Sequence, residues 1–259
     1  MNDSKAQPSR MARRAGFIAV AGFVIGLLAA LGMLLAGPLY RMDLAGLRQA
    51  FGLMGLGAKT GVVAIILGLV WLILAMVAKS RRGSWLAALG VALGLLAFVP
   101  PWMFMHKARL VPPIHDISTD TTQPPAFRAL LEQRKSAPNS SAYGGAEIAS
   151  QQHKAYPDIK PMQLRATAPQ VFAAALATAR DMDWAIAAKD PSEGRIEATA
   201  TTLWFGFKDD VVIRIRAQDD GDTRLDIRSL SRVGQSDVGK NAERIRSFEK
   251  KLREALSSS

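Results

Sequence analysis

Three long stretches without a charged residue constrain the fold of this chain most strongly. They cover residues 16–39, 61–78 and 84–105. At a rise of about 1.5 Å per residue, about 20 residues cross the roughly 30 Å hydrocarbon core of a bilayer. Each stretch therefore predicts a transmembrane helix. Because all three fall within the first 105 residues, buried helices of a soluble protein are a poor alternative. The first stretch is far longer than the apolar part of a signal peptide, so we interpret it as an uncleaved anchor.

The positive charge of the chain is concentrated in this membrane half. Residues 1–105 hold ten of the 33 Lys and Arg but two of the 22 acidic residues, so +8 of the net +11 belongs to them. Basic residues normally flank membrane helices. The high net charge therefore does not indicate nucleic-acid binding.

The distribution of Lys and Arg predicts the orientation. One side of the membrane would carry Lys5, Arg10, Arg13, Arg14, Lys79, Arg81 and Arg82, and the other Arg41, Arg48, Lys59, Lys107 and Arg109. The more basic side is expected to be cytoplasmic. The chain is then a multi-pass protein of the cell membrane with a cytoplasmic N-terminus. Its three spans place residues 106–259 outside, in the periplasm of a cell with two membranes.

Two features adjoin the predicted spans. Leu44, Leu47, Phe51 and Met54 recur at helical spacing, which fits a short helix lying in the interface. The glycines at 46, 52, 55 and 57 fit a loop equally well. Pro100 and Pro101 are expected to kink the last turn of the third span.

The remaining residues predict a soluble α+β domain. Residues 106–161 are rich in proline and predict an irregular connector, with a short helix over 126–135 and a mobile loop over 136–150. Residues 162–259 alternate between periods of two and 3.6 in the order β-α-β-β-β-β-α. This order predicts an antiparallel sheet covered on one face by two helices. The layout resembles the helix-on-sheet folds of TATA-binding-protein type and of START-like lipid carriers, in topology alone.

Two segments of this domain resemble a known family. Residues 204–214, Trp-Phe-Gly-Phe-Lys-Asp-Asp-Val-Val-Ile-Arg, resemble the FGF-x-DDV core of DUF1499, a family of unknown function. Residues 226–241 resemble the RS-x-SR-x-G-x-SD-x-G-x-N segment that follows it. The resemblance covers about residues 112–256 and implies a domain without an assigned activity. Many members begin with Asn-Cys-Val-Ser, whereas His115-Asp116-Ile117-Ser118 has no cysteine, so no thiol chemistry is implied.

Arginines on the outward face of the last two strands are the first candidate site. Guanidinium groups bind phosphate and carboxylate in bidentate fashion, so this face fits anionic lipid headgroups or glycans. The alternative is a solvated face paired with Glu197 and nearby aspartates. Serines on the inward face need a hydrogen-bond partner or a polar pocket. The candidates are Arg214, Arg216, Arg228 and Arg232 outward, and Ser229 and Ser231 inward.

The loop over residues 234–239 is the second candidate site. It leads into the last helix, whose N-terminus fits an anion with the help of Arg232, Ser236 and Arg244. The alternative is plain capping of the helix by Ser236 or Asp237.

Catalytic chemistry has weaker support. His115, Asp116 and Asp120 lack metal-ligand spacing. Asp209 and Asp210 point to opposite faces if they lie in a strand, and a turn is their expected place. We find no nucleophile elbow, Walker or dinucleotide pattern, and expect no catalytic residue, metal or cofactor.

Three functions remain open. The first is a non-catalytic cell-envelope protein whose extracytoplasmic domain binds a lipid, an anionic glycan or a protein partner. The second is a membrane-anchored enzyme that uses His115, Asp116 and Asp120 with the arginines and serines of the last strand. The third is a subunit of a membrane complex, packed through Gly22, Gly26, Gly32, Gly90 and Gly94.

Overall fold

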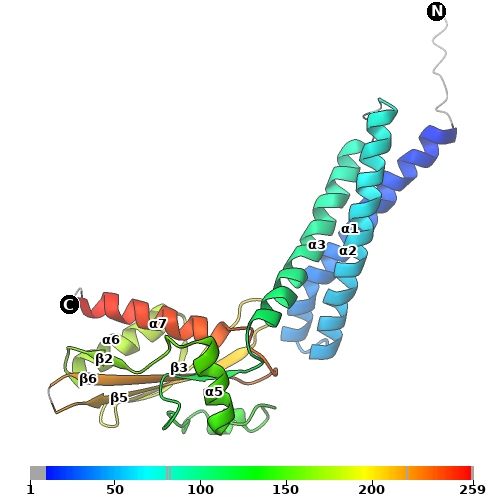
Figure 1. The fold of residues 1–259 in the computed structure, drawn as a ribbon. Helices are drawn as coiled ribbons and strands as arrows, with labels where there is room; N and C mark the ends of the chain where they lie inside the picture. The colour runs from blue at the N-terminus through cyan, green and yellow to red at the C-terminus, as the bar shows by residue number, and fades with distance from the viewer. Residues whose placement is uncertain (1–9, 80, 82, 220, 258–259) are drawn as a thin grey trace, which may run out of the picture. The chain divides into compact units, whose positions relative to one another are not determined.

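A computed structural model describes residues 10–79, 81, 83–219 and 221–257, which divide into two compact units between His106 and Lys107. Figure 1 shows helices in the first unit and a sheet with helices in the second. Of the basic residues used to predict orientation, Lys5 and Arg82 lie outside the described residues, as do the side chains of Arg10, Arg13 and Arg14.

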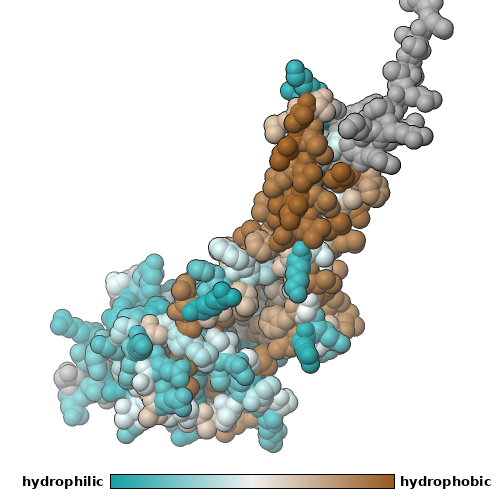
Figure 2. Space-filling view, turned by 45° about the vertical axis from the view of Figure 1, so that its right-hand side comes forward, coloured by the Kyte–Doolittle hydropathy of each residue, from teal (hydrophilic) through white to brown (hydrophobic). Residues whose placement is uncertain are grey.

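The first unit consists of α1 (Arg10–Arg41), α2 (Leu47–Val77) and α3 (Ser84–Leu110), of which the last turn belongs to the second unit. Each helix contains a segment long and apolar enough to cross a membrane: Gly16–Arg41, Leu47–Val77 and Ser84–Leu110. Apolar residues dominate the visible surface of these helices, whereas hydrophilic residues dominate that of the second unit (Figure 2). The prediction of three membrane helices is confirmed.

Helix α2 is longer than predicted. Leu47, Phe51 and Met54 form its first turns, so the segment is neither a separate interfacial helix nor a loop. The backbone N–H of Gly46 donates to Oε1 of Gln49 at 2.8 Å and closes the helix start. Helix α3 runs through Pro100 and Pro101 to Leu110, so these prolines do not mark its last turn.

Small residues hold the three helices together. A Cβ added at Gly26 would lie 2.8 Å from the carbonyl oxygen of Gly90, and one added at Gly61 would lie 2.8 Å from that of Gly94. Such distances require bare backbone on both sides. The glycines predicted to contact other subunits therefore make contacts within this chain.

The second unit is built on an antiparallel sheet with the order β1-β6-β5-β4-β3, in which β2 also pairs with β6. The strands are β1 (Asp116–Ser118), β2 (Met162–Leu164), β3 (Ala185–Asp190), β4 (Arg195–Thr201), β5 (Lys208–Ala217) and β6 (Thr223–Ser231). Helices α6 (Ala168–Asp181) and α7 (Lys240–Ser257) cover one face. The predicted β-α-β-β-β-β-α order is confirmed from β2 to α7.

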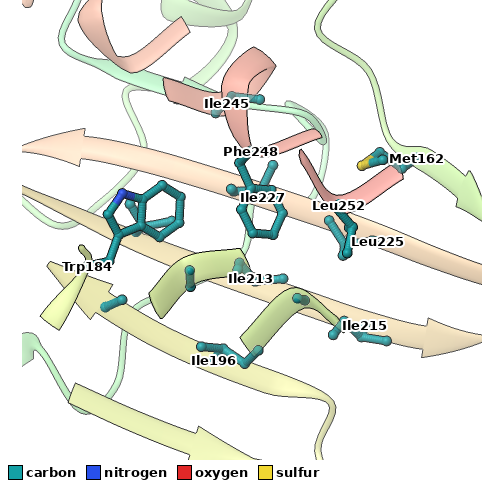
Figure 3. Packing of buried hydrophobic residues seen from close by; sticks show 14 of the residues in the cluster. Met162, Trp184, Ile196, Ile213, Ile215, Leu225, Ile227, Ile245, Phe248 and Leu252 are labelled. Carbon is teal, nitrogen blue, oxygen red and sulfur yellow. The ribbon is translucent and has the colours of Figure 1, made fainter. Parts of the chain in front are cut away.

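The core lies between α6, α7 and the sheet (Figure 3). Ile213 and Ile227 point from the strands toward Phe248 of α7, whose ring stacks on Trp184 at a centroid distance of 5.4 Å. These side chains are nearly or fully buried. Packed side chains therefore fill this layer. In a lipid carrier with this layout, a ligand cavity is expected in the same place.

Residues 106–161 are more ordered than the predicted connector. They contain β1, α4 (Leu131–Arg134) and α5 (Gly145–Ala155), and α5 replaces part of the predicted mobile loop. The reason is tertiary: Ser118 of β1 donates its N–H to Oε1 of Gln152 at 3.0 Å, and Nε2 of Gln152 donates to the Ser118 carbonyl at 2.7 Å. The amide of Gln152 thus extends the edge of the sheet like a strand residue.

Candidate functional site

Most of the sheet face opposite the helices is covered, so the predicted solvent exposure is wrong, whereas the predicted pairing of its arginines with nearby aspartates is confirmed. Residues between β1 and α5 run over this face, and Phe127 and Leu130 pack on Val212 and Leu230. Several polar residues of the face are buried: Glu197, Thr199, Asp210, Asp226 and Arg228. Most of the face is therefore closed to solvent, and Arg216 and Arg224 at its edge keep partial exposure.

Asp210 lies at the centre of one buried network on this face. Its carboxylate accepts hydrogen bonds from Arg134 Nη1 at 2.6 Å, from Arg232 Nε at 2.9 Å and Nη2 at 2.8 Å, and from Thr199 Oγ1 at 2.7 Å. Burial by itself raises the pKa of Asp210, but the bonds from Arg232, Thr199 and Arg134 together outweigh burial and lower it. The guanidinium group of Arg232, a predicted ligand residue, is thus already bound to the carboxylate of Asp210.

Arg228 is likewise held by hydrogen bonds within the domain. Its guanidinium donates to both oxygens of Asp116, at 2.9 and 2.7 Å, and to the carbonyls of Pro125 and Ser141. It also lies 5.1 Å from the ring centroid of Phe127 and 5.5 Å from that of Tyr143. With 2% of its side chain exposed, Arg228 is a structural cation.

A third cluster combines three guanidinium groups with two carboxylates. Arg214 contacts Asp120 at 2.9 Å and Asp226 at 2.8 Å, and Arg224 contacts the same carboxylates at 2.9 and 3.0 Å. Arg216 reaches Asp226 at 3.0 Å and keeps 40% of its side chain exposed. The cluster therefore carries one positive charge in excess near the surface.

The predicted inward serines lie on the helix side, in a polar network with α7. Ser229 Oγ donates to Oδ1 of Asn241 at 2.7 Å, and Nδ2 of Asn241 donates to Ser231 Oγ at 3.0 Å. Arg244 donates to Ser229 at 3.0 Å and to Asp209 at 2.5 Å. Asp209 and Asp210 thus point to opposite faces, as predicted, but they lie in strand β5 instead of a turn.

The start of α7 is capped from within the chain. Asp237 accepts the backbone N–H of Gly239 at 2.7 Å and that of Asn241 at 2.8 Å, while Ser236 Oγ accepts the N–H of Val238 at 3.1 Å. Capping, the alternative reading of this loop, therefore occupies donors that a bound anion would need.

The residues of the enzymatic alternative do not converge. Arg228 and its partner Asp116 lie on the covered face, whereas Ser229 and Ser231 lie on the helix side of the same strand. His115 Nδ1 lies 3.2 Å from the carbonyl oxygen of Gln235. A sheet thus separates groups that would have to meet at one reacting atom.

Two adjoining hollows beside β1 and α5 form an open groove. Their volumes are about 490 and 650 Å³, and they share Thr121, Thr122 and His153. Asp120, Lys160 and Arg224 line the first hollow, and Pro124, Tyr143, Gly145 and Ser150 line part of the second. Sequence reasoning missed this groove because its walls come largely from the segment predicted as a connector.

These features define a membrane-anchored α+β domain held by buried ion pairs. Residues 116–252 match the family model of DUF1499, described as a protein of unknown function. The match covers more than half of the chain, so the chain belongs to the DUF1499 family. No curated protein matches it. The motif residues Asp209, Asp210, Arg228, Ser229, Ser231, Arg232, Asp237 and Asn241 are those that build the networks above.

Proposed function

We propose that this protein is a non-catalytic component of the cell envelope whose extracytoplasmic domain binds an anionic glycan in the groove between Arg224 and Tyr143. The observation that carries the proposal is the excess positive charge on one wall. Arg224 and Lys160 line the first hollow, where Asp120 is the one lining carboxylate. Arg214 and Arg216 do not line it, but they share the carboxylate of Asp226 with Arg224 and so add positive charge behind that wall.

The shape of the groove favours a glycan over an enclosed lipid. Among the described residues, core side chains pack the space between the helices and the sheet, which argues against a buried acyl chain there. The groove instead joins two open hollows that share Thr121, Thr122 and His153, which suits an extended chain. Hydroxyl and imidazole groups in its walls match the hydrogen-bonding groups of sugars.

The state of the charged motif residues supports a non-catalytic role. A general acid or base must reach its substrate directly or through one water. Asp116 and Asp210 are buried under the covering segment and bonded to arginines. The motif residues therefore support the scaffold on which the groove is built.

Binding of polygalacturonate, which carries a carboxylate on each sugar, tests the proposal. We expect salt-dependent binding to the full-length protein in detergent, measured by titration calorimetry, and no binding of neutral dextran. Lys160→Glu should weaken binding by about tenfold or more, because it reverses one charge at the groove. Lys189→Glu, an exposed lysine of β3, is the matched control and should bind normally. Failure to bind polygalacturonate, or equal loss in both variants, would refute the glycan proposal.

The orientation is tested independently by cysteine labelling, because the chain has no native cysteine. A Lys189→Cys variant should react with a membrane-impermeant maleimide in cells whose outer barrier, if present, is opened. A Ser84→Cys variant, at the start of the third span, should react only after the cell membrane is permeabilised. The reverse pattern would place the domain in the cytoplasm.

A further inference from the structure

A groove in the membrane unit lies beside the end of α2. Its volume is about 660 Å³, and its walls are mainly apolar. Leu69, Ile73 and Met76 of α2 line it in succession. Their exposed fractions are 47%, 55% and 72%, respectively. Their spacing of three to four residues places them along one face of the helix. In a membrane this face contacts acyl chains.

Cations stand at one end of the groove. Lys79 and Arg81 line it beyond the last turn of α2, and Ser84 lines it at the start of α3. The N-terminus of α3 adds partial positive charge at the same end. The one acidic residue among the described residues of this unit is Asp43, which precedes α2 at its opposite end. Lys79 and Arg81 therefore have no carboxylate partner within the described unit.

We propose that this groove binds a phospholipid with an anionic headgroup. One acyl chain lies along Leu69, Ile73 and Met76, and the headgroup phosphate lies between Lys79 and Arg81. Arg81 offers a bidentate fork to phosphate oxygens, and Lys79 offers a point charge. Basic pockets between membrane helices on the cytoplasmic side bind acidic headgroups by the same chemistry. This site lies in the membrane unit, whereas the glycan groove lies in the soluble unit, and the two would bind different ligands. The lipid proposal therefore does not depend on the glycan proposal.

Native mass spectrometry of the full-length protein in detergent tests this site. Phosphatidylglycerol and phosphatidylcholine with identical acyl chains are added at equal concentration. We expect phosphatidylglycerol to be retained about 25-fold more, because each of the two basic residues contributes about fivefold. The double variant K79Q/R81Q should abolish most of this preference. The variant K79R/R81K keeps both charges and should keep the preference.

The control is the double variant R48Q/K59Q. It removes two exposed charges from the other part of α2, so the net charge falls equally. It should retain phosphatidylglycerol as the unaltered chain does. Equal retention of the two lipids would show that the site does not recognise headgroup charge. An equal loss in R48Q/K59Q and K79Q/R81Q would reduce the preference to unspecific charge attraction, and either result would overturn the proposal. Measurement in detergent keeps the result separate from any effect of these charges on topology.

Discussion

Replacement of Asp210 by alanine is expected to destabilise the soluble domain by about 3–5 kcal/mol. The variant leaves Arg134, of whose side chain 2% is exposed, and Arg232 without the carboxylate that both contact. These cations would keep hydrogen bonds to neutral acceptors, the Asn139 carbonyl and Gln133 Oε1, but would lose the opposite charge that offsets their desolvation. In hydrogen exchange of the full-length protein, amides of β5 and β6 should exchange about a hundredfold faster or more.

Asp158→Ala is the matched control. Asp158 contacts Arg246 at 2.6 Å, but 55% and 42% of the two side chains are exposed. Exposed pairs contribute about 0–1 kcal/mol, so exchange in β5 and β6 should change little. Equal effects of the two substitutions would show that burial of Asp210 does not matter.

A triple variant distinguishes two causes of the destabilisation: the buried arginines left without a carboxylate, and the loss of the hydrogen bonds themselves. Replacing Asp210 by leucine together with Arg134→Met and Arg232→Met removes the buried charges on both sides. It should be markedly more stable than Asp210→Ala, since buried ion pairs are often replaced by apolar groups at little cost. A triple variant as unstable as the single one would indicate that the lost hydrogen bonds, and not the orphaned cations, cause the effect.

Acid should weaken the same network. The pKa of Asp210 is lowered in the folded protein, as the bonds from Arg232, Thr199 and Arg134 outweigh burial. The unfolded chain therefore binds the proton more readily, and stability falls as the pH drops through and below the ordinary carboxylate pKa of about 4. The Asp210→Ala variant should lack this part of the acid dependence.

Gly61→Leu should disrupt the membrane helices, with a cost at or above the upper end of the about 1–3 kcal/mol typical of overpacking. A Cβ at Gly61 would lie 2.8 Å from the carbonyl oxygen of Gly94 and 3.1 Å from Cβ of Ala97. The nearest atom is backbone, so α2 and α3 must separate. Thermal aggregation of the detergent-solubilised protein should begin at a lower temperature.

Gly55→Leu is the control within the same helix. No heavy atom lies within 4 Å of a Cβ built at Gly55, so leucine fits there. Its better helix propensity should even stabilise α2 by a few tenths of a kcal/mol to about 1 kcal/mol. Similar behaviour of the two variants would contradict the packing of α2 against α3 through Gly61 and Gly94.

The sequence alone predicted the elements whose cause is local. Uncharged runs long enough to span a bilayer predicted α1 to α3, and alternating residues predicted the strands from β2 to β6 and the inward direction of Ile213 and Ile227. The DUF1499 motifs were also recognised. These features need no knowledge of distant contacts, because hydrophobic length and period are properties of a single segment.

Tertiary structure alone decided what covers the outward face of the sheet. Each strand has polar residues on its outward face, and this pattern predicts that the face is exposed to solvent. In the structure, Arg134 comes from 76 positions before its partner Asp210, and Asp116 from 112 before Arg228. Charge pairing over such separations leaves no periodic trace in a sequence. The polar groove at His153 and the replacement of a predicted loop by α5 have the same origin, since both depend on where a distant segment is placed by the fold.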